Sequence, residues 1–321
     1  MTAHVNRSLA VFALALIADF ALGEPPHALH PVAWLGTASS LLSRRLASEP
    51  LLRRPRRELM AGATIATLMI SAAVLTSRTL MRLTRRLPSP LALAIEAYLL
   101  KTCFSGRMLF QAVATVQASL QRNDLEAART AASQLVSRQV HYLPPPLIAA
   151  AAIETLSENL SDSLIAPLLG YIYFGLPGAA AYRAINTLDA MFGYRDEREF
   201  LGKAPARLDD VANWLPARLT ALCISLAGLP FGISPWRIWQ EARREHRKTL
   251  SPNAGWPMAA MASLLRVCLE KHGTYRICPQ YREPSALDLR TSLRFAALAS
   301  ALGCLTIASI LYHRTRRTFS A

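Results

Sequence analysis

Residues 293–312 read LRFAALASALGCLTIASILY, an almost uninterrupted apolar run that is followed by Arg314, Arg316 and Arg317. Roughly 20 apolar residues in a helix are enough to cross the hydrocarbon core of a bilayer. Arginines directly beyond such a run are typical of the ends of membrane helices. This stretch therefore predicts a transmembrane helix and places the chain among helical membrane proteins.

The composition of the whole chain agrees with that class. Of its 321 residues, 52% are hydrophobic and 18% are charged, and the mean hydropathy is +0.22. Soluble domains average about 45–50% apolar and about 25% charged residues. The sequence has no linker-like or low-complexity segment and no evident repeat. We therefore expect residues 1–321 to form a single all-α membrane domain.

Further apolar segments predict a polytopic protein with about four or five spans, some of them broken. Residues 59–76 and 215–233 are the other continuous candidates, while 164–185 is interrupted by glycines and a proline. Broken helices are tolerated at membrane depth where they line a polar cavity. Residues 9–22 are apolar except for Asp19. A signal peptide is the alternative there, but an acid within its core favours a retained helix.

Polar helical and loop insertions are expected between these segments. Residues 91–100 predict an amphipathic or partly buried helix. Residues 123–136 predict a helix of the soluble type, which Asn123 or Asp124 could cap. Residues 193–213 indicate a polar connection.

The net charge of +15 comes from 36 Lys and Arg against 21 Asp and Glu, and most of the excess is arginine beside apolar segments. Positive-inside topology and attraction to anionic membrane lipid explain this pattern best. A partner rich in phosphate or carboxylate is the alternative. No nucleic-acid partner is expected, because the basic runs lack interleaved aromatics and any recognition motif. Segment 59–76 has arginines on both flanks, so the positive-inside rule does not orient it.

The cysteines indicate buried free thiols. There are five, an odd number, and they are widely scattered without a CxxC pair or a Cys/His metal spacing. The pattern supports neither a disulfide framework nor a zinc site.

Three carboxylates follow one another at helical spacing: Glu154, Glu158 and Asp162, on a helix that the prolines at 144–146 could start. Positions i, i+4 and i+8 form one slowly drifting stripe, with neighbouring Cβ atoms roughly 5–6 Å apart. Such carboxylates repel one another unless a cation or an arginine lies between them. They could share Mg²⁺, or one could be a base with a raised pKa. A solvated acidic face is the alternative, and the apolar flanking sequence weakens it.

A second group of arginines, amides and aspartates follows, at the end of an apolar segment and in the polar connection. Arginines suit bidentate binding of phosphate or carboxylate, and paired aspartates suit Mg²⁺. Taken singly, each could be a surface salt bridge, and Arg183 could reach toward the membrane interface. The candidates are Arg183, Asn186, Asp189, Arg195, Arg207, Asp209 and Asp210.

Two shorter motifs are also candidates. Residues 251–257, SPNAGWP, are turn-rich and could present backbone N–H groups to an anion. A plain connecting loop is the alternative. His30 lies among prolines after the first apolar segment, and an exposed histidine without a catalytic role is the more common outcome. The chain has no GxxxxGK[ST] loop and no GxGxxG after a strand, so no standard nucleotide fold is indicated.

Together these motifs resemble the CobD/CbiB family of cobalamin-biosynthesis membrane proteins, the adenosylcobinamide-phosphate synthases. The matches follow the family's order from about residue 17 to residue 262. They include Asp19…Gly23-Glu-Pro-Pro, His30-Pro-Val, Val136-Ser-Arg138, Glu154…Glu158-Asn159-Leu-Ser-Asp162, Ala184-Ile-Asn186-Thr-Leu-Asp189, Arg207-Leu-Asp209-Asp210…Asn213-Trp-Leu-Pro-Ala-Arg218 and Ser251-Pro-Asn253-Ala-Gly255-Trp-Pro257. The chain departs from the family at Gln139-Val140, where the family usually has Asp-Thr.

The resemblance implies a multi-pass protein of the inner membrane that forms an amide with ATP. The family joins adenosylcobyric acid, through its propionate side chain, to aminopropanol or its O-phosphate. Mg²⁺ and ATP are the implied cofactors. Besides substrates and lipid, a second copy of the chain or other proteins of the corrinoid pathway are the partners left open.

Carried onto this sequence, the resemblance implies catalytic roles for Glu154, Glu158 and Asp162. The expected metal ligands are Glu158, Asp162, Asp209 and Asp210. The expected substrate-binding residues are His30, Arg138, Asn159, Arg183, Asn186, Asp189, Arg195, Arg207, Asn213, Arg218, Ser251, Asn253 and Gly255.

Two other functions fit parts of the pattern. A membrane transporter would also place carboxylates and broken helices at membrane depth, but inverted repeats would be expected and none is evident. A non-catalytic, corrinoid-binding or sensor relative of the family is favoured only by Gln139-Val140.

Overall fold

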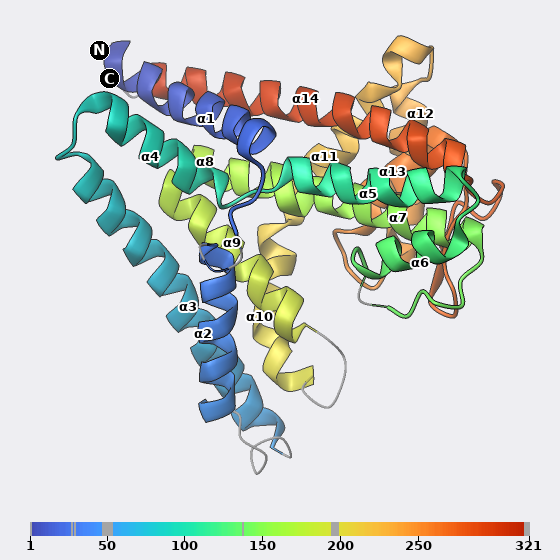
Figure 1. The fold of residues 1–321 in the computed structure, drawn as a ribbon, viewed down its shortest axis with the longest axis horizontal. Helices are drawn as coiled ribbons and strands as arrows, with labels where there is room; N and C mark the ends of the chain where they lie inside the picture. The colour runs from blue at the N-terminus through green and yellow to red at the C-terminus, as the bar shows by residue number, and fades with distance from the viewer. Residues whose placement is uncertain are drawn as a thin grey trace. The chain divides into compact units, whose positions relative to one another are not determined.

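The computed structural model describes residues 2–26, 28, 30–46, 54–136, 138–193 and 199–317 (Figure 1). These residues are mostly helical and contain one two-stranded sheet, which agrees with the expected helical class. The α-helices are α1 (Thr2–Leu22), α2 (Pro31–Leu46), α3 (Pro55–Thr84), α4 (Ser89–Lys101), α5 (Gly106–Gln121), α6 (Leu125–Ser133), α7 (Pro145–Leu160), α8 (Ala166–Phe174), α9 (Leu176–Phe192), α10 (Glu199–Ala212), α11 (Trp214–Ala227), α12 (Pro235–Glu245), α13 (Gly255–Leu265) and α14 (Ala286–Arg317). The strands are β1 (Leu269–Lys271) and β2 (Tyr275–Ile277).

Three helices of the described chain are long and apolar enough to cross a membrane. They are α3, the stretch Trp214–Phe231 that begins with α11, and α14 over Ala286–Arg314. At about 1.5 Å of rise per residue, α3 and α14 each exceed the ~30 Å hydrocarbon core. These three match the segments 59–76, 215–233 and 293–312, while the total of four or five spans stays a prediction.

Local signals in the sequence explain several helix boundaries. Asp124 caps α6, because its carboxylate accepts the N–H of Ala127 at 3.0 Å. The break expected within 164–185 falls at Gly175, whose φ of +67° favours a residue without a side chain. The expected polar connection over 193–213 contains a helix, α10 (Glu199–Ala212), which buries Leu201, Gly202 and Pro205 on one face. The many charged residues of this segment obscure its amphipathic pattern in the sequence.

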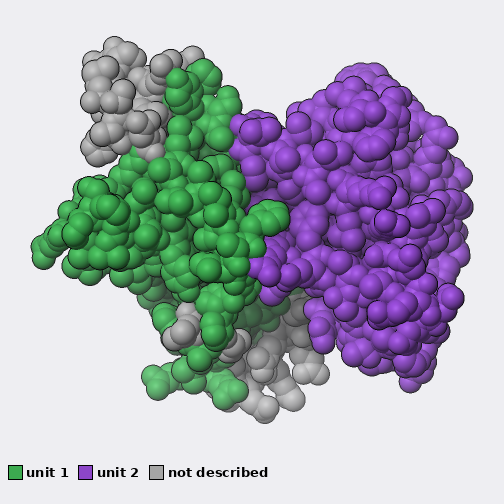
Figure 2. Space-filling model, turned by 45° about the horizontal axis from the view of Figure 1, so that its top comes forward, with its two compact units in different colours: residues 1–105, 166–212, 307–321 green, residues 106–165, 213–306 purple. Residues whose placement is uncertain are grey.

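The described residues fall into two compact units, coloured in Figure 2. Unit 1 comprises residues 1–105, 166–212 and 307–321, and unit 2 comprises 106–165 and 213–306. Each unit is assembled from segments that alternate along the chain. The division therefore does not cut the sequence into two consecutive domains.

Unit 1 is built around the packing of α3 against α9 and α10, with α2 beside them (Figure 1). Its core joins Ile65 and Ala66 of α3 to Leu188 and Leu201. Gly62 permits the close approach of α3 and α10, since a Cβ there would lie 2.0 Å from the carbonyl oxygen of Leu201. In the same unit, α1 packs against α4.

Unit 2 surrounds α7, which contacts α5, α6, α13 and β1. Its helix begins at Pro145, as the proline run predicted, because proline suits the first turn of a helix. From residue 148 to 157 every side chain of α7 is buried. Glu154 is consequently placed in the interior of unit 2, not on a solvated acidic face.

A π-helix over Ser161–Ile165 follows α7. Pro167 accounts for it, because proline has no N–H to donate to the carbonyl four residues earlier, and its ring clashes with that carbonyl. A π-helical turn contains more residues than an α-helical turn, so Asp162 does not continue the stripe that the i, i+4, i+8 spacing predicted. Glu154 and Glu158 share a regular α-helical turn, while Asp162 lies in the wider π turn. Such turns are frequent at functional sites.

All five cysteines are free, as the sequence predicted. Cys103, Cys223, Cys268 and Cys278 are buried, and Cys304 is partly buried. They behave as small apolar side chains in helix and loop packing.

Candidate functional site

The strongest candidate site of unit 2 lies where α7 meets the β1–β2 hairpin. The hairpin pairs Leu269 with Ile277 and Lys271 with Tyr275, across a turn that contains Gly273 at φ +70°. Because side chains on one face of a strand recur every second residue, Lys271 and Tyr275 share a face with the buried pair Leu269 and Ile277. That face carries them toward α7, which β1 contacts.

Glu154 is the centre of this site. Its carboxylate is buried and accepts a hydrogen bond from Nη2 of Arg138 at 2.9 Å. Arg138 arrives from the segment between α6 and α7. The other carboxylate oxygen, Oε1, is buried without a hydrogen-bond partner among the described residues, and so is Nε of Arg138. A buried pair that leaves polar atoms unsatisfied is costly, which is typical of functional sites.

The electrostatic surroundings place the pKa of Glu154 near neutrality. Burial raises the pKa of Glu154 to about 7, and the charge of Glu158 adds to that increase. Arg138, Tyr275 and Lys271 act in the opposite direction. Burial also raises the pKa of Tyr275, with the charges of Glu154 and Glu158 as further causes. A carboxylate with a pKa near 7 can accept or donate a proton at neutral pH.

Glu158 and Asp162 are half-buried and lie on the same helical path as Glu154. The described residues contain no group of three or more His, Cys, Asp or Glu side chains arranged to hold a metal ion. Magnesium sites of nucleotide-dependent enzymes commonly use one or two protein carboxylates with substrate phosphates and water, and binding of Mg²⁺ by Glu158 and Asp162 stays a prediction. Asn159, between them, donates to the carbonyl of Thr155 and accepts from Ser163.

A second part of unit 2 brings together four predicted binding residues. Arg218 of α11 donates to the side-chain oxygen of Asn253 at 3.3 Å, and the backbone N–H of Asn253 donates to Oγ of Ser251. Gly255 begins α13 beside this turn, where a Cβ would lie 2.1 Å from the carbonyl oxygen of His246. The SPNAGWP motif is therefore a turn that holds an arginine, and Asn213 lies buried just before α11.

Aromatic rings complete this arginine site. The guanidinium carbon of Arg218 lies 4.4 Å from the ring centroid of Trp214 and 5.1 Å from that of Trp256. His246 stacks on Trp256 with a centroid separation of 4.2 Å, and burial is the leading cause that lowers the pKa of His246. An arginine between two indoles can bind an anion while its faces stay covered.

In unit 1, His30 belongs to a buried ionic cluster. Lys101 is fully buried and places Nζ 2.8 Å from Glu24 and 3.6 Å from Asp19. Nδ1 of His30 accepts the N–H of Val32 at 3.2 Å, which leaves the ring proton on Nε2, 2.9 Å from the Glu24 carboxylate. Although burial opposes it, hydrogen bonds from His30 and Lys101 lower the pKa of Glu24 to about 2.

The remaining predicted residues of unit 1 are spread over α9 and α10. Arg183 and Asn186 face each other, with Nη1 to Oδ1 at 3.5 Å, and Asp189 is one turn further along α9. Arg207 is exposed and forms an i, i+3 ion pair with Asp210 at 3.5 Å. This pair is a surface salt bridge, which the sequence left open as the alternative to a binding role. Asp209 is half-buried. Arg195 lies outside the described residues.

Sequence reasoning missed Lys101, Trp256, Lys271 and Tyr275. Lys101 was a usable signal, because it follows an apolar segment. A lysine that is buried there requires a carboxylate partner. The hairpin residues carried no comparable signal, since their proximity to Glu154 depends on tertiary contacts. Val140, at the departure from the family, is fully buried, and its neighbour Gln139 is exposed.

Comparisons with known proteins give the family. A family model described as "CobD/Cbib protein" matches residues 12–303. The cobalamin biosynthesis protein CobD of Dehalococcoides mccartyi is 36% identical over 95% of this chain and 97% of its own length. A probable CobD of Pyrococcus abyssi is 43% identical over 89% of this chain and 90% of its own. No solved structure matches the chain. With its buried carboxylates, its candidate spans and these relatives, the chain belongs to the CobD/CbiB family.

Proposed function

We propose that this protein forms an amide between adenosylcobyric acid and aminopropanol or its O-phosphate, at the expense of ATP. Its relatives are named for cobalamin biosynthesis, which makes a corrinoid the substrate of choice. The observation that carries the proposal is Glu154, a buried carboxylate whose pKa of about 7 fits it to accept a proton at neutral pH.

The proton balance of amide formation requires such a base. The amine is an ammonium ion at neutral pH and has no lone pair until it loses a proton. The propionate carboxylate is a poor acyl donor, so ATP transfers a phosphoryl group to it and ADP leaves. The amine nitrogen then forms the C–N bond as the C–O bond to phosphate breaks. Inorganic phosphate carries away the electron pair of the broken C–O bond. The nitrogen loses two protons in all: the Glu154 carboxylate takes the one that frees the lone pair, and the departing phosphate takes the second.

The surroundings of Glu154 suit this role. Arg138 donates to one carboxylate oxygen at 2.9 Å, and Tyr275 is a second donor to the carboxylate. Oε1 is buried without a geometric hydrogen-bond partner among the described residues, and we assign it to the ammonium. The positive charges of Arg138 and Lys271 moderate the increase in pKa that burial causes. Without them the pKa of the carboxyl would be higher, and less of it would be in the base form at neutral pH.

Glu158 and Asp162 are the residues we assign to Mg²⁺, together with phosphate oxygens of ATP. When bound, the ion would neutralise charge on the triphosphate. Arg218, held between Trp214 and Trp256, is the residue we assign to a phosphate or carboxylate of the substrates.

The first experiment supplies the purified protein with adenosylcobyric acid, aminopropanol phosphate, ATP and Mg²⁺, and detects the amide by mass spectrometry. Glu154→Gln should lower the rate by about 10²–10⁴-fold, the usual contribution of a general base. Glu126→Gln is the matched control, because Glu126 lies on α6 of the same unit with 81% of its side chain exposed. It should leave the rate unchanged.

The outcomes separate the proposed enzyme from its alternatives. Product that forms only with ATP, and depends on Glu154 but not on Glu126, supports the proposal. Tight corrinoid binding without product would instead favour a non-catalytic relative. A full rate in Glu154→Gln would disprove the role of this residue as the base and leave the reaction itself intact.

A further inference from the structure

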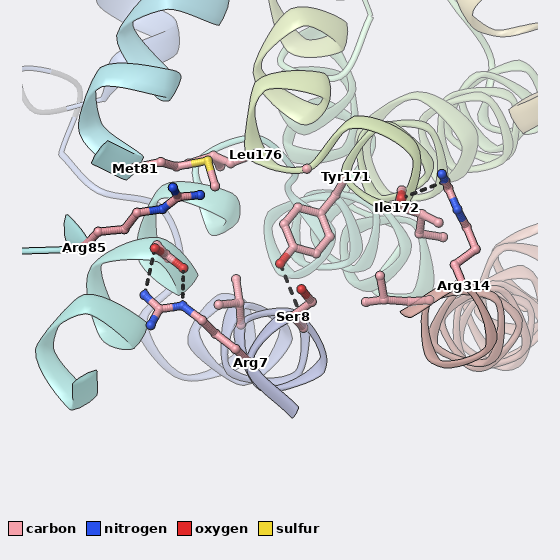
Figure 3. Close-up of a pocket in the computed structure, with 12 residues that line it drawn as sticks. Arg7, Ser8, Met81, Arg85, Tyr171, Ile172, Leu176 and Arg314 are labelled. Carbon is pink, nitrogen blue, oxygen red and sulfur yellow. Dashed lines mark hydrogen bonds and ion pairs between the residues drawn. The ribbon is translucent and has the colours of Figure 1, made fainter. Parts of the chain in front are cut away.

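A cavity in unit 1 lies outside every motif used so far. Figure 3 shows it between α1, the end of α3, α4, the α8–α9 turn and the end of α14, with a volume of about 560 Å³. Its charged lining residues are Arg7, Arg85, Arg314 and Glu96. Its apolar lining includes Val11, Ile172, Leu176 and Leu311.

The single carboxylate of this lining is already saturated. Arg7 donates to Glu96 through Nε at 3.2 Å and through Nη2 at 2.9 Å. Thr84 donates to the same carboxylate at 3.0 Å. Three arginines against one glutamate leave the cavity with a net charge of +2, since 3 − 1 = 2. Guanidinium groups gathered in this way favour an anion that is not part of the described chain.

The other two arginines are placed to receive that anion. Arg314 is fixed by a hydrogen bond from Nη1 to the carbonyl of Ile172 at 3.0 Å and by the Tyr173 ring at 5.1 Å. Arg85 reaches into the same space from the end of α3 (Figure 3). No ion pair of Arg85 is found within the described part of the chain.

The position of the cavity along the spans indicates the ligand. Arg85 directly follows α3, and Arg314 is close to the end of α14, so two candidate membrane spans end here. Ends of spans lie at the level of lipid headgroups, where arginines meet lipid phosphates. The apolar side chains of the lining would cover the first part of an acyl chain.

We propose that this cavity binds the phosphate of an anionic membrane lipid through Arg85 and Arg314. The chemistry recognised is a phosphate ester anion, and the apolar lining favours lipid over a free phosphate. Such a lipid would stabilise the junction of α1, α3 and α14 within unit 1. The inference is independent of the proposed reaction, because none of these residues belongs to the assigned catalytic set.

The test measures lipid binding by the purified full chain in phosphatidylcholine nanodiscs, titrated with phosphatidylglycerol and read by native mass spectrometry. Arg85→Gln should weaken retention of phosphatidylglycerol about tenfold, as expected for the loss of one hydrogen bond to a charged group. Arg82→Gln is the matched control, since Arg82 is an exposed arginine of α3 that does not line the cavity. Arg85→Lys should retain part of the affinity.

Each result decides the proposal. A selective loss in Arg85→Gln, with the thermal unfolding temperature in phosphatidylcholine unchanged, supports it. Equal loss in both variants would mean attraction of lipid to the basic surface as a whole and would overturn it, as would no loss in either. If inorganic phosphate displaces the lipid at concentrations below those of phosphatidylglycerol, the site is one for a free phosphate and the lipid assignment is wrong.

Discussion

Two carboxylates of this protein, half-buried Glu24 and buried Glu154, have similar neighbours and opposite protonation behaviour. Glu24 of unit 1 lies beside Lys101 and His30, and its pKa falls to about 2. Glu154 of unit 2 lies beside Arg138 and Lys271, and its pKa rises to about 7. Both have a basic partner, so the presence of a cation does not explain the difference. The Glu154 side chain is the more deeply buried of the two, with 7% of it exposed against 16% for Glu24.

The extent of burial, the donors to the charged form and the neighbouring charges explain it together. The Glu24 carboxylate receives both the Lys101 ammonium at 2.8 Å and the His30 ring N–H at 2.9 Å. Both donors to Glu24 reach the same oxygen, Oε2. Glu154 receives Arg138 at 2.9 Å, and Tyr275 as a second donor also lowers its pKa, but burial and the neighbouring carboxylate of Glu158 raise it. Hydrogen bonds and a cation that favour the charged form lower the pKa of a carboxylate, while burial and a neighbouring negative charge raise it. The first cluster therefore keeps its carboxylate charged at neutral pH, while the second leaves Glu154 able to gain or lose a proton there.

The largest effect that would test this comparison is loss of the buried cation. Lys101→Met should lower the free energy of unfolding by about 3–5 kcal/mol, because it leaves Asp19 and Glu24 buried without their ammonium. Denaturation of the purified protein in detergent measures it. A loss below about 1 kcal/mol would show that water enters the cluster and that it does not stabilise unit 1.

The pH dependence of stability should differ between the clusters. The folded pKa of Glu24 is depressed from 4.5 to about 2, so its contribution is present above pH 4.5 and is lost as the pH falls toward 2. Thermal unfolding followed from pH 6 to pH 3 should show this decline in the native chain. Glu24→Gln should be less stable at pH 6 and should respond less to acid. Parallel curves for the two proteins would contradict the assignment.

Removal of Arg138 should widen the difference between the two carboxylates. Burial raises the pKa of Glu154 to about 7, and Arg138 opposes that increase, so Arg138→Gln should raise the pKa further. The base form would then appear only at higher pH. The rising limb of the pH–rate profile should move upward, while Arg138→Lys should keep it near its native position. Infrared titration of the carboxyl group gives an independent measurement.

The smallest effect is expected at an exposed pair. Arg207 has 76% of its side chain exposed and contacts Asp210 at 3.5 Å. Exposed pairs contribute about 0–1 kcal/mol, because solvent screens them and ordering two side chains costs entropy. Arg207→Met should therefore change the free energy of unfolding by less than Lys101→Met does, in the same assay. A comparable loss would give Arg207 a role that its exposure does not explain.

The sequence predicted the helical class, the three candidate spans and the break near Gly175, because hydropathy, proline and glycine act locally. It also placed Glu154, Glu158 and Asp162 on one path. It could not predict that Arg138 would pair with Glu154, or that Lys271 and Tyr275 would lie near it, because those contacts join segments far apart in the chain. The π turn was missed although Pro167 was visible, since a proline in a helix can also produce a kink.

The contact of the Ser251–Pro257 turn with Arg218 was also beyond local reasoning. Its turn positions Arg218 from another helix, and the rings of Trp214 and Trp256 fix the guanidinium. The candidate residues of unit 1, among them Arg183 and Asn186, form a group of their own. Their roles toward substrate stay predictions.

The burial of the thiols has a practical consequence for mapping this protein in its membrane. Burial raises the pKa of Cys103 to about 12 and raises the pKa of Cys278, and maleimide reagents react with thiolates. The native chain should therefore give a weak labelling background, with Cys304 the first residue to replace. Single cysteines introduced at exposed positions, such as Tyr142 or Trp236, would then report through membrane-impermeant reagents which side of the bilayer each segment faces.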